Sequence, residues 1–299
     1  MVESASRDQK HGKVAVISLI IVIITAIVVA TSLPGIGLLF ALAIAPTVFL
    51  LWYFYHADKY KHESTRLLGG TFLIGALSII PAVVVESHYT QPTTGLLDIF
   101  LYFLLGVGVT EELMKFLSVR LYPYRSKHFD EPMDGIVFGV AAALGFATIE
   151  NILYVLKYGI ETAVVRAIVS VPGHAFWGAI IGFYLAEAKV RRQPLLALEG
   201  LAFTIFLHGL FDTVATVVPS DIVSLALLGA LTWTVYFKVV KKEVAEAEAE
   251  SPYAPTRNLS TAKEHPATSR APKFCPQCGA HVEVGATFCV NCGRQLEEV

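Results

Sequence analysis

Long apolar runs separated by short polar segments make up most of this 299-residue chain. A helix needs about 20 consecutive, mainly apolar residues to cross the hydrocarbon core of a bilayer. The pattern predicts an all-α fold, a polytopic membrane bundle of about eight transmembrane helices. The runs cover residues 14–31, 36–55, 67–85, 95–119, 133–158, 165–187, 195–218 and 222–237.

The composition agrees with a membrane protein. Hydrophobic residues make up 55% of the chain and charged residues 16%, with a mean hydropathy of +0.59. In soluble domains about a quarter of the residues are charged. The net charge is −2 and no dispersed basic surface is evident, so no nucleic-acid partner is expected. The lipid bilayer is the partner that the composition itself implies.

Lysine and arginine alternate between the two sides of the predicted bundle. Fifteen lie in the tail before run 14–31 and after the second, fourth, sixth and eighth runs, against two, Lys157 and Arg166, elsewhere. Cytoplasmic loops carry the excess of positive charge, so we expect a multi-pass protein of the cell membrane with both termini in the cytoplasm. A signal-peptide interpretation of run 14–31 is disfavoured for two reasons. The run is longer than the apolar h-region of a signal peptide, and its removal would break the alternation of positively charged loops.

All four cysteines lie in the last 25 residues, as two C-x2-C pairs separated by ten residues. Such pairs are typical of a zinc ribbon, in which four thiolates close a tetrahedral Zn²⁺ site. A disulfide interpretation is disfavoured because the tail is expected in the cytoplasm, whereas iron in place of zinc stays open. Four thiolates leave no open position, so we expect a structural ribbon that docks a cytoplasmic partner. The predicted zinc ligands are Cys275, Cys278, Cys289 and Cys292.

The composition changes after the last apolar run. Residues 243–272 are rich in Ala, Glu, Pro, Ser and Thr, which predicts a flexible linker with a short helical start at 243–250. We therefore expect a transmembrane domain at 1–242, with its chemistry at about 95–218. The zinc ribbon, built of β-hairpin knuckles, is expected at 273–299.

Ionisable residues interrupt the four runs between 95 and 218. A charge at the centre of a bilayer costs roughly 3 kcal/mol or more. Counting about 1.5 Å of helix rise per residue from the ends of the runs places these groups at one shared depth, in the middle-to-outer layer. Singly each has an ordinary structural explanation, but a common depth on four helices predicts a polar chamber. Its candidate catalytic residues are Glu111, Glu112, Glu150, His174, His208 and Asp212.

Spacing along the helices assigns partners within this chamber. His208 and Asp212 are four residues apart and share one helix face, where the carboxylate can orient the imidazole. Lys115 follows Glu112 by three residues and Glu111 by four, so it neutralises one carboxylate and leaves the other as a candidate general base. By depth, Lys115 is expected outside the chamber, nearer the cytoplasm.

Other residues of these runs receive structural interpretations. Asn151 is expected to bond backbone or a neighbouring helix in a supporting role, and Asp134 is expected to be the N-cap of run 133–158, outside the chamber. Small residues recur at every fourth position, which predicts closely packed membrane helices. They are Gly135, Gly139, Ala143 and Ala147 on one run and Gly178 and Gly182 on the next.

Four motifs follow one another in the fourth to seventh runs. They are Glu111-Glu112-Leu-Met-Lys115, Asp134-Gly135 to Gly139 followed by Gly145-Phe146-Ala-Thr-Ile-Glu150-Asn151, His174 with Gly182, and His208-Gly-Leu-Phe-Asp212. In this order they resemble the PrsW family of intramembrane proteases, within the wider group of CAAX prenyl endopeptidases and bacteriocin-protection proteins. The prenyl endopeptidases carry His where this chain has Glu150, which favours the PrsW branch.

The resemblance implies hydrolysis of a membrane-spanning protein substrate, such as a regulator of the anti-sigma-factor type. One of the paired glutamates would activate water with help from His174, and His208 with Asp212 would stabilise the oxyanion. Glu150 would bind water or a substrate amide. Whether the family's site holds a second Zn²⁺ or works as a metal-independent glutamate protease stays open, because histidines and carboxylates suit both.

Two other functions compete with proteolysis. Intramembrane Glu, His and Asp also build proton relays in transporters, which often contain inverted repeats and interrupted helices. No internal repeat is visible, and the fourth to seventh runs lack central prolines. The second alternative is a non-catalytic scaffold that presents the zinc ribbon, for which the buried polar set would be dispensable.

Overall fold

The computed structural model of this protein describes residues 35–218, 222–254, 273–274, 281–282 and 292. The chain divides into two compact units, Met1–Ala254 and Pro255–Val299. The predicted run 14–31 and three of the four predicted zinc ligands, Cys275, Cys278 and Cys289, lie outside the described residues.

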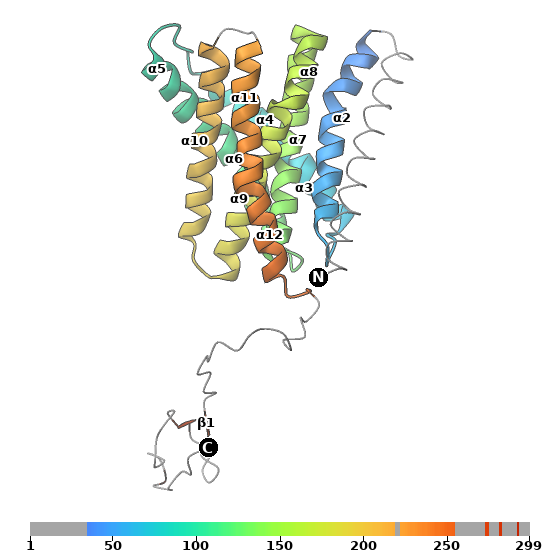
Figure 1. Cartoon of the computed structure of the whole chain (residues 1–299), viewed down its shortest axis with the longest axis vertical. Coiled ribbons are helices and arrows are strands. Elements are labelled where there is room, and N and C mark those ends of the chain that lie inside the picture. The colour runs from blue at the N-terminus through green and yellow to red at the C-terminus, as the bar shows by residue number, and fades with distance from the viewer. Residues whose placement is uncertain (1–34, 219–221, 255–272, 275–280, 283–291, 293–299) are drawn as a thin grey trace. The chain divides into compact units, whose positions relative to one another are not determined.

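The described part of the first unit is a helix bundle (Figure 1). Six of its helical segments are long and apolar enough to cross a membrane, which confirms the predicted all-α membrane bundle. The count of eight was approximate, since run 14–31 is not described and run 95–119 is divided into three pieces. The helices are α2 (Ile36–Ala57), α3 (Thr65–Leu77), α4 (Ile79–Glu86), α5 (Leu96–Leu101), η1 (Tyr102–Gly108), α6 (Val109–Leu121), η2 (Pro123–Arg125), α7 (Pro132–Tyr158), α8 (Ile160–Ile168), α9 (Ser170–Val190), α10 (Leu195–Val217), α11 (Ile222–Val235), η3 (Tyr236–Val240) and α12 (Lys241–Glu250).

Helices α7 and α9 form the centre of the bundle. The apolar windows of the segments that contain them are 78% and 72% buried, against 22–33% for the other four membrane-length segments. The two backbones touch at the predicted small-residue stripes, because a Cβ added at Gly139 would lie 2.0 Å from the carbonyl oxygen of Gly178. The prediction of close packing is confirmed, and it fixes the relative position of two helices that carry candidate residues.

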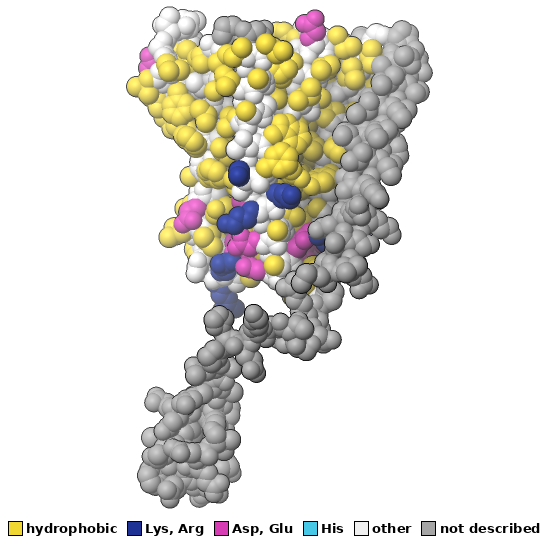
Figure 2. All heavy atoms as spheres, viewed as in Figure 1, with side chains coloured by type: hydrophobic (Ala, Val, Ile, Leu, Met, Phe, Trp, Pro, Cys, Tyr) yellow, Lys and Arg dark blue, Asp and Glu magenta, His cyan; other side chains and the backbone are white. Residues whose placement is uncertain are grey.

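The outer surface is largely apolar. Figure 2 shows hydrophobic side chains over most of the length of the helices, with charged side chains gathered toward one end. Single residues such as Ile222 and Leu195 are 82% and 68% exposed. A surface of this kind suits lipid contact, as the sequence predicted.

Two of the helices that carry candidate residues are interrupted. Between α8 and α9 the regular helix breaks at Val169, because Pro172 has no N–H to donate and its ring clashes with the carbonyl of Ile168. That freed carbonyl accepts a hydrogen bond from Nε1 of Trp233 at 3.2 Å. This break was not predicted, because Pro172 lies near the start of run 165–187 and the runs lack central prolines.

Run 95–119 contains a second interruption. The seven residues of η1 form a π-helix just before α6, a local widening that is frequent at functional sites. Helix α10 passes close to this region, because a Cβ added at Gly209 would lie 2.7 Å from Cα of Leu104. The absence of a side chain at Gly209 thus lets α10 bring its next residues beside the start of α6.

The end of the bundle near α12 holds the cap of α7. Glu131 is the N-cap and Asp134 is at the N3 position, and their side chains form a reciprocal capping box. Asp134 was predicted to be the N-cap itself, so its capping role is correct but its position is not. Helix α12 covers the predicted helical start at 243–250, and Ser251 just beyond it hydrogen-bonds to Glu131.

In the second unit the described residues form a two-stranded antiparallel pair. Strand β1 (Lys273–Phe274) pairs with β2 (His281–Val282), with Lys273 opposite Val282. Such a pair is the kind of element expected of β-hairpin knuckles. Cys292, the one predicted zinc ligand among the described residues, is exposed in a turn.

Candidate active site

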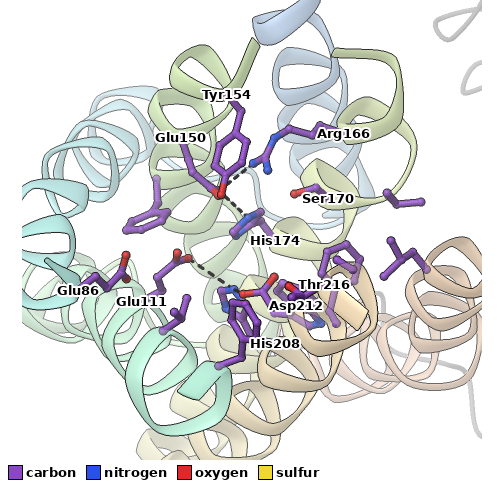
Figure 3. A pocket seen from close by; sticks show the side chains of 18 of the residues that line it. Glu86, Glu111, Glu150, Tyr154, Arg166, Ser170, His174, His208, Asp212 and Thr216 are labelled. Carbon is purple, nitrogen blue, oxygen red and sulfur yellow. Dashed lines mark ion pairs between the residues drawn. The ribbon is translucent and has the colours of Figure 1, made fainter. Parts of the chain in front are cut away.

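A cavity of about 470 Å³ lies between α4, η1, α6, α7, α8, α9 and α10 (Figure 3). Apolar residues such as Phe146 and Trp177 form part of its wall. Five of the six candidate residues, Glu111, Glu150, His174, His208 and Asp212, line the cavity. The structure therefore brings them together, although they are spread over about 100 residues of sequence.

Helix α6 contributes two carboxylates and the lysine between them. Nζ of Lys115 lies 3.0 Å from Oε2 of Glu111 and 2.7 Å from Oε1 of Glu112. Glu112 is fully buried and is absent from the cavity wall, whereas Glu111 lines it. The two adjacent glutamates thus differ in access, and only one of them faces the space where a substrate can lie.

Lys115 lies inside the cluster, and its predicted place outside the chamber is wrong. Its Nζ also lies 3.0 Å from Nδ1 of His174 on α9. The depth count followed the backbone, whereas helical side chains point toward the N-terminus of their helix. The four-carbon stem of Lys115 therefore carries its ammonium toward the two glutamates, and the residue is almost fully buried.

His208 on α10 lies among three carboxylates, and its Nε2 is 3.8 Å from Oε2 of Glu111 (Figure 3). Its Nδ1 lies 2.7 Å from Oε1 of Glu112, and its Nε2 lies 3.3 Å from Oδ2 of Asp212. The ring stacks on Trp177 at 4.9 Å between centroids. Because both ring nitrogens face carboxylate oxygens, the imidazolium form satisfies this arrangement with two donors. His208 can therefore present positive charge to the cavity.

His174 joins the α6 cluster to Glu150 on α7. Its Nε2 lies 2.9 Å from Oε2 of Glu150, while its Nδ1 faces the ammonium of Lys115. A lysine can only donate, so Nδ1 accepts and Nε2 carries the hydrogen. Contacts thus run without interruption from Glu150 through His174 and Lys115 to the glutamates of α6.

Arg166 on α8 belongs to this site, although its place at the start of run 165–187 did not mark it as a candidate residue. Its Nη2 lies 2.9 Å from Oε2 of Glu150, and its Nε donates to Oδ1 of Asn151 at 2.8 Å. The guanidinium also lies 4.3 Å from the ring centroid of Tyr154. Asn151 in turn donates to the carbonyl of Ala43 at 2.7 Å, which is the supporting contact to a neighbouring helix that was expected.

Glu86 is the second site residue that sequence reasoning missed. It is the last residue of α4, and its side chain points into the cavity beside Glu111 (Figure 3). Glu86 and Arg166 both stand next to the end of an apolar run, where a charge is read as a boundary marker. The signal that they share is a charged residue within one helical turn of a run end.

Two groups of side chains in the site come close to the spacing of a metal site. Ligand atoms of Glu111, Glu112 and His208, and separately of Glu111, Glu150 and His174, lie within 4.8 Å of one another. Ligands of a tetrahedral Zn²⁺ stand about 3.4 Å apart, as bonds of about 2.0–2.2 Å require. Nδ1 of His208 and Oε1 of Glu112 are only 2.7 Å apart, which is a hydrogen-bond distance and too short for two ligands of one zinc ion.

Lys115 opposes a metal in either set, because its ammonium lies within 3.0 Å of Glu111, Glu112 and His174. Its charge neutralises the carboxylates that would bind the ion, and its hydrogens engage the lone pair of His174. As these side chains lie, the donor set does not fit a resident metal ion.

Known protein families match both parts of the chain. Residues 63–240 match the profile of the PrsW family intramembrane metalloproteases, and residues 274–296 match that of a zinc-ribbon domain. The chain is 35% identical over 203 residues to Protease PrsW of Bacillus subtilis (strain 168), covering 67% of this chain and 92% of that protein.

Two further relatives are similar. Protease PrsW of Geobacillus kaustophilus (strain HTA426) is 37% identical over 181 residues, 58% of this chain and 78% of that protein. Protease PrsW of Clostridioides difficile (strain 630) is 31% identical over 185 residues, 58% of this chain and 77% of that protein. No solved structure matches the chain significantly. The family profile and the extent of these similarities show that the chain belongs to the PrsW family of intramembrane proteases and carries a C-terminal zinc-ribbon domain.

Proposed function

We propose that this protein is an intramembrane endopeptidase of the glutamate type, in which Glu111 activates the attacking water. The observation that carries this proposal is the unequal placement of the two adjacent glutamates. Glu111 lines the cavity, whereas Glu112 is fully buried and engaged by Lys115 and His208. Glu112 is thus occupied as a structural anion, and Glu111 is the one placed to meet a substrate.

The reaction begins when the carboxylate of Glu111 takes a proton from a water molecule. The water oxygen attacks the scissile carbonyl carbon and forms a tetrahedral intermediate. His208, which Glu112 and Asp212 hold in its imidazolium form, stabilises the oxyanion with its positive charge. Glu111 then returns its proton to the leaving amine nitrogen as the carbon–nitrogen bond breaks, so the enzyme ends in its starting protonation state.

The α7–α9 side of the cavity positions the substrate. Glu150 accepts a substrate amide N–H or a bound water, and Arg166 and His174 hold its carboxylate in place. The metal-free mechanism is supported by the ammonium of Lys115, which lies within 3.0 Å of Glu111, Glu112 and His174. The substrates that suit a buried site are membrane-spanning regulators of the anti-sigma-factor type.

The remaining assignments follow the charge pattern and the cysteine spacing. Both termini lie in the cytoplasm, and the protease domain occupies residues 1–242, joined by the linker at 243–272 to a ribbon at 273–299. In that ribbon a structural Zn²⁺ binds Cys275, Cys278, Cys289 and Cys292. The ribbon docks a cytoplasmic partner.

The proteolytic function is tested by cleavage of single-pass substrates in reconstituted vesicles. Glu111→Gln should abolish cleavage because Gln cannot accept the proton, and Glu112→Gln and His208→Ala should reduce it strongly. Undiminished cleavage by all three variants would sink the proposal. Because the bundle contains interrupted helices, which are frequent in transporters, proton flux is measured on the same vesicles. Flux that these variants abolish, without any proteolysis, would identify a transporter.

The metal-free mechanism has its own test. In the full chain, the four ribbon cysteines are replaced by serine so that ribbon zinc does not mask the analysis. This variant should purify without stoichiometric metal and should keep its cleavage rate after treatment with a chelator. One equivalent of bound zinc, with activity lost on chelation and restored by zinc, would overturn the metal-free mechanism while leaving proteolysis intact.

A further inference from the structure

Glu86 is a carboxylate without a partner in the cavity. Its Oε1 is buried and has no hydrogen-bond partner, and its side chain forms no ion pair with any described residue. The other carboxylates of the cavity are all engaged. Glu111 contacts Lys115, Glu150 contacts Arg166 and His174, and Asp212 contacts His208.

An unpaired carboxylate in an apolar surrounding is unfavourable, and buried polar groups in native proteins are nearly always hydrogen-bonded. The cationic side chains of the cavity cannot relieve Glu86, since Arg166 is committed to Glu150 and Asn151 and His208 to Glu112 and Asp212. A protonated basic group that enters the cavity would supply the partner that this carboxylate lacks.

The position of Glu86 says which part of a substrate can meet it. Gln91 and Thr216 line both this cavity and a second hollow of about 600 Å³ under the segment 91–95. The cavity thus continues toward the end of the bundle where α4 ends and α5 begins. Glu86 lies beside Glu111 in the cavity (Figure 3), so an extended chain bound at Glu111 passes Glu86 within a few residues, at about 3.3–3.6 Å per residue.

We propose that Glu86 is a specificity residue that binds the protonated side chain of a lysine or arginine close to the scissile bond of the substrate. A long basic side chain can reach along an apolar wall and place its charge on a buried carboxylate. Hydrogen bonds to charged groups are among the strongest in proteins. This inference rests on the proposed proteolytic function, whose substrate class it narrows to chains with a basic residue near the cleavage site.

The test uses the full-length protein and a panel of single-pass substrates that differ at one position at a time near the cleavage site. Each position carries lysine, arginine, glutamate, glutamine or norleucine, the last of which matches the length of lysine without its charge. At one position the wild type should cleave the lysine and arginine substrates about ten- to a hundredfold more efficiently, by kcat/KM, than the norleucine substrate.

The variant Glu86→Gln should bring this ratio close to one, and Glu86→Lys should turn the preference toward a glutamate substrate. A merely structural role for Glu86 would slow all substrates alike and leave the ratio unchanged. Glu161→Gln serves as the control, since Glu161 is an exposed carboxylate of α8 that does not line the cavity.

The outcomes separate the two proposals. Equal lysine-to-norleucine ratios in wild type and Glu86→Gln, or a wild type without basic preference at any position, would overturn the role of Glu86 while proteolysis stands. If the wild type cleaves no substrate of the panel or of the vesicle assay above, the proposed function fails first. Loss of the ratio in Glu161→Gln as well would also overturn the assignment to Glu86.

Discussion

The bundle contains two clusters in which one lysine lies among several carboxylates. In the first, here called the Lys115 cluster, the ammonium contacts Glu111, Glu112 and His174 within 3.0 Å. In the second, the Lys61 cluster, Nζ of Lys61 lies 2.6 Å from Asp130 and 3.5 Å from both Glu63 and Asp134. The charges are similar, but the two clusters serve different purposes.

The carboxylates of the Lys61 cluster hold the backbone. Oδ2 of Asp134 accepts the N–H groups of Asp130 at 2.7 Å and Glu131 at 2.9 Å, which fixes the start of α7. No residue of this cluster lines either of the two cavities described above. The Lys115 cluster instead borders a cavity, includes His174 and contacts a second histidine, His208, through Glu112. Access and proton-carrying groups, rather than buried charge alone, distinguish the candidate active site from a structural charge cluster.

Replacement of the central lysine should separate the clusters most strongly. Lys115→Met leaves Glu111, Glu112 and His174 without their shared donor, so we expect cleavage to fall on the order of a thousandfold, within the range of general acid–base contributions. Lys61→Met should lower the thermal stability, because Lys61 pairs with the carboxylates that hold the start of α7. The activity of the folded fraction should stay within about threefold of the wild type, because Lys61 does not line the cavity. Cleavage rates per folded molecule, with folding checked by size-exclusion chromatography, measure both.

The comparison fails if the two lysine variants lose activity alike, or if Lys115→Met stays active. A conservative variant sharpens it further. Lys115→Arg keeps the charge but changes the shape of the donor, so it should fold as the wild type does while cleaving poorly. Full activity of Lys115→Arg would show that charge alone suffices at this position.

The sequence was informative about the Lys115 cluster because its residues interrupt apolar runs. Glu150, His174 and His208 each stand in the interior of a run, where a polar residue is costly and therefore conspicuous. The depth of Lys115 was wrong because a long side chain displaces its charge from its backbone. Arg166 and Glu86 were missed because a charge at the end of a run is the ordinary sign of a membrane boundary.

The fold shows the same division between what a pattern can and cannot predict. The small-residue stripes that include Gly139 on α7 and Gly178 on α9 have a helical period. They correctly predicted closely packed helices, which the structure forms between α7 and α9. The π-helix η1 leaves no periodic signal, and Pro172 reads as a residue near a run end. The Lys61 cluster was not predicted, because its residues come from two loops and a helix start that only the tertiary fold brings together.

Arg166 should have the next largest effect on activity. Its Nε and Nη2 reach Asn151 and Glu150 at the same time, and a lysine cannot reproduce two donors in a fixed plane. We expect Arg166→Lys and Arg166→Gln to lower kcat about ten- to a hundredfold with a smaller change in KM, because Glu150 and His174 lose their orientation.

Lys157 offers a matched control for this variant. Its ammonium also lies over a tyrosine ring, 4.9 Å from the centroid of Tyr158, and it does not line the cavity. Lys157→Gln should therefore cleave as the wild type does. A wild-type kcat for Arg166→Lys would mean that Arg166 acts only through its charge. Equal losses of kcat in Arg166→Gln and Lys157→Gln would point to a general effect of positive charge near the end of α7 and in α8.

The smallest expected effect concerns the pH dependence of stability in the Lys61 cluster. Burial, together with the neighbouring carboxyl of Asp134, raises the pKa of Glu63 from 4.5 to about 9 in the folded protein, although Lys61 opposes the shift. The side chain of Glu63 is fully buried, outside the membrane-length segments. In the unfolded chain the same carboxyl ionises near its ordinary pKa.

Between pH 4.5 and 9 the folded protein therefore keeps a proton on Glu63 that the unfolded chain releases. The contribution of Glu63 to stability is fully present below the unfolded pKa and is lost as the pH rises toward the folded pKa. Glu63→Gln is neutral at every pH, so its melting temperature in detergent should match the wild type near pH 5 and exceed it by a few degrees at pH 8–9. Parallel melting curves across this range would mean that Glu63 is ionised beside Lys61. The Lys61 cluster would then be a conventional ion pair, and the contrast with the Lys115 cluster would rest on the cavity alone.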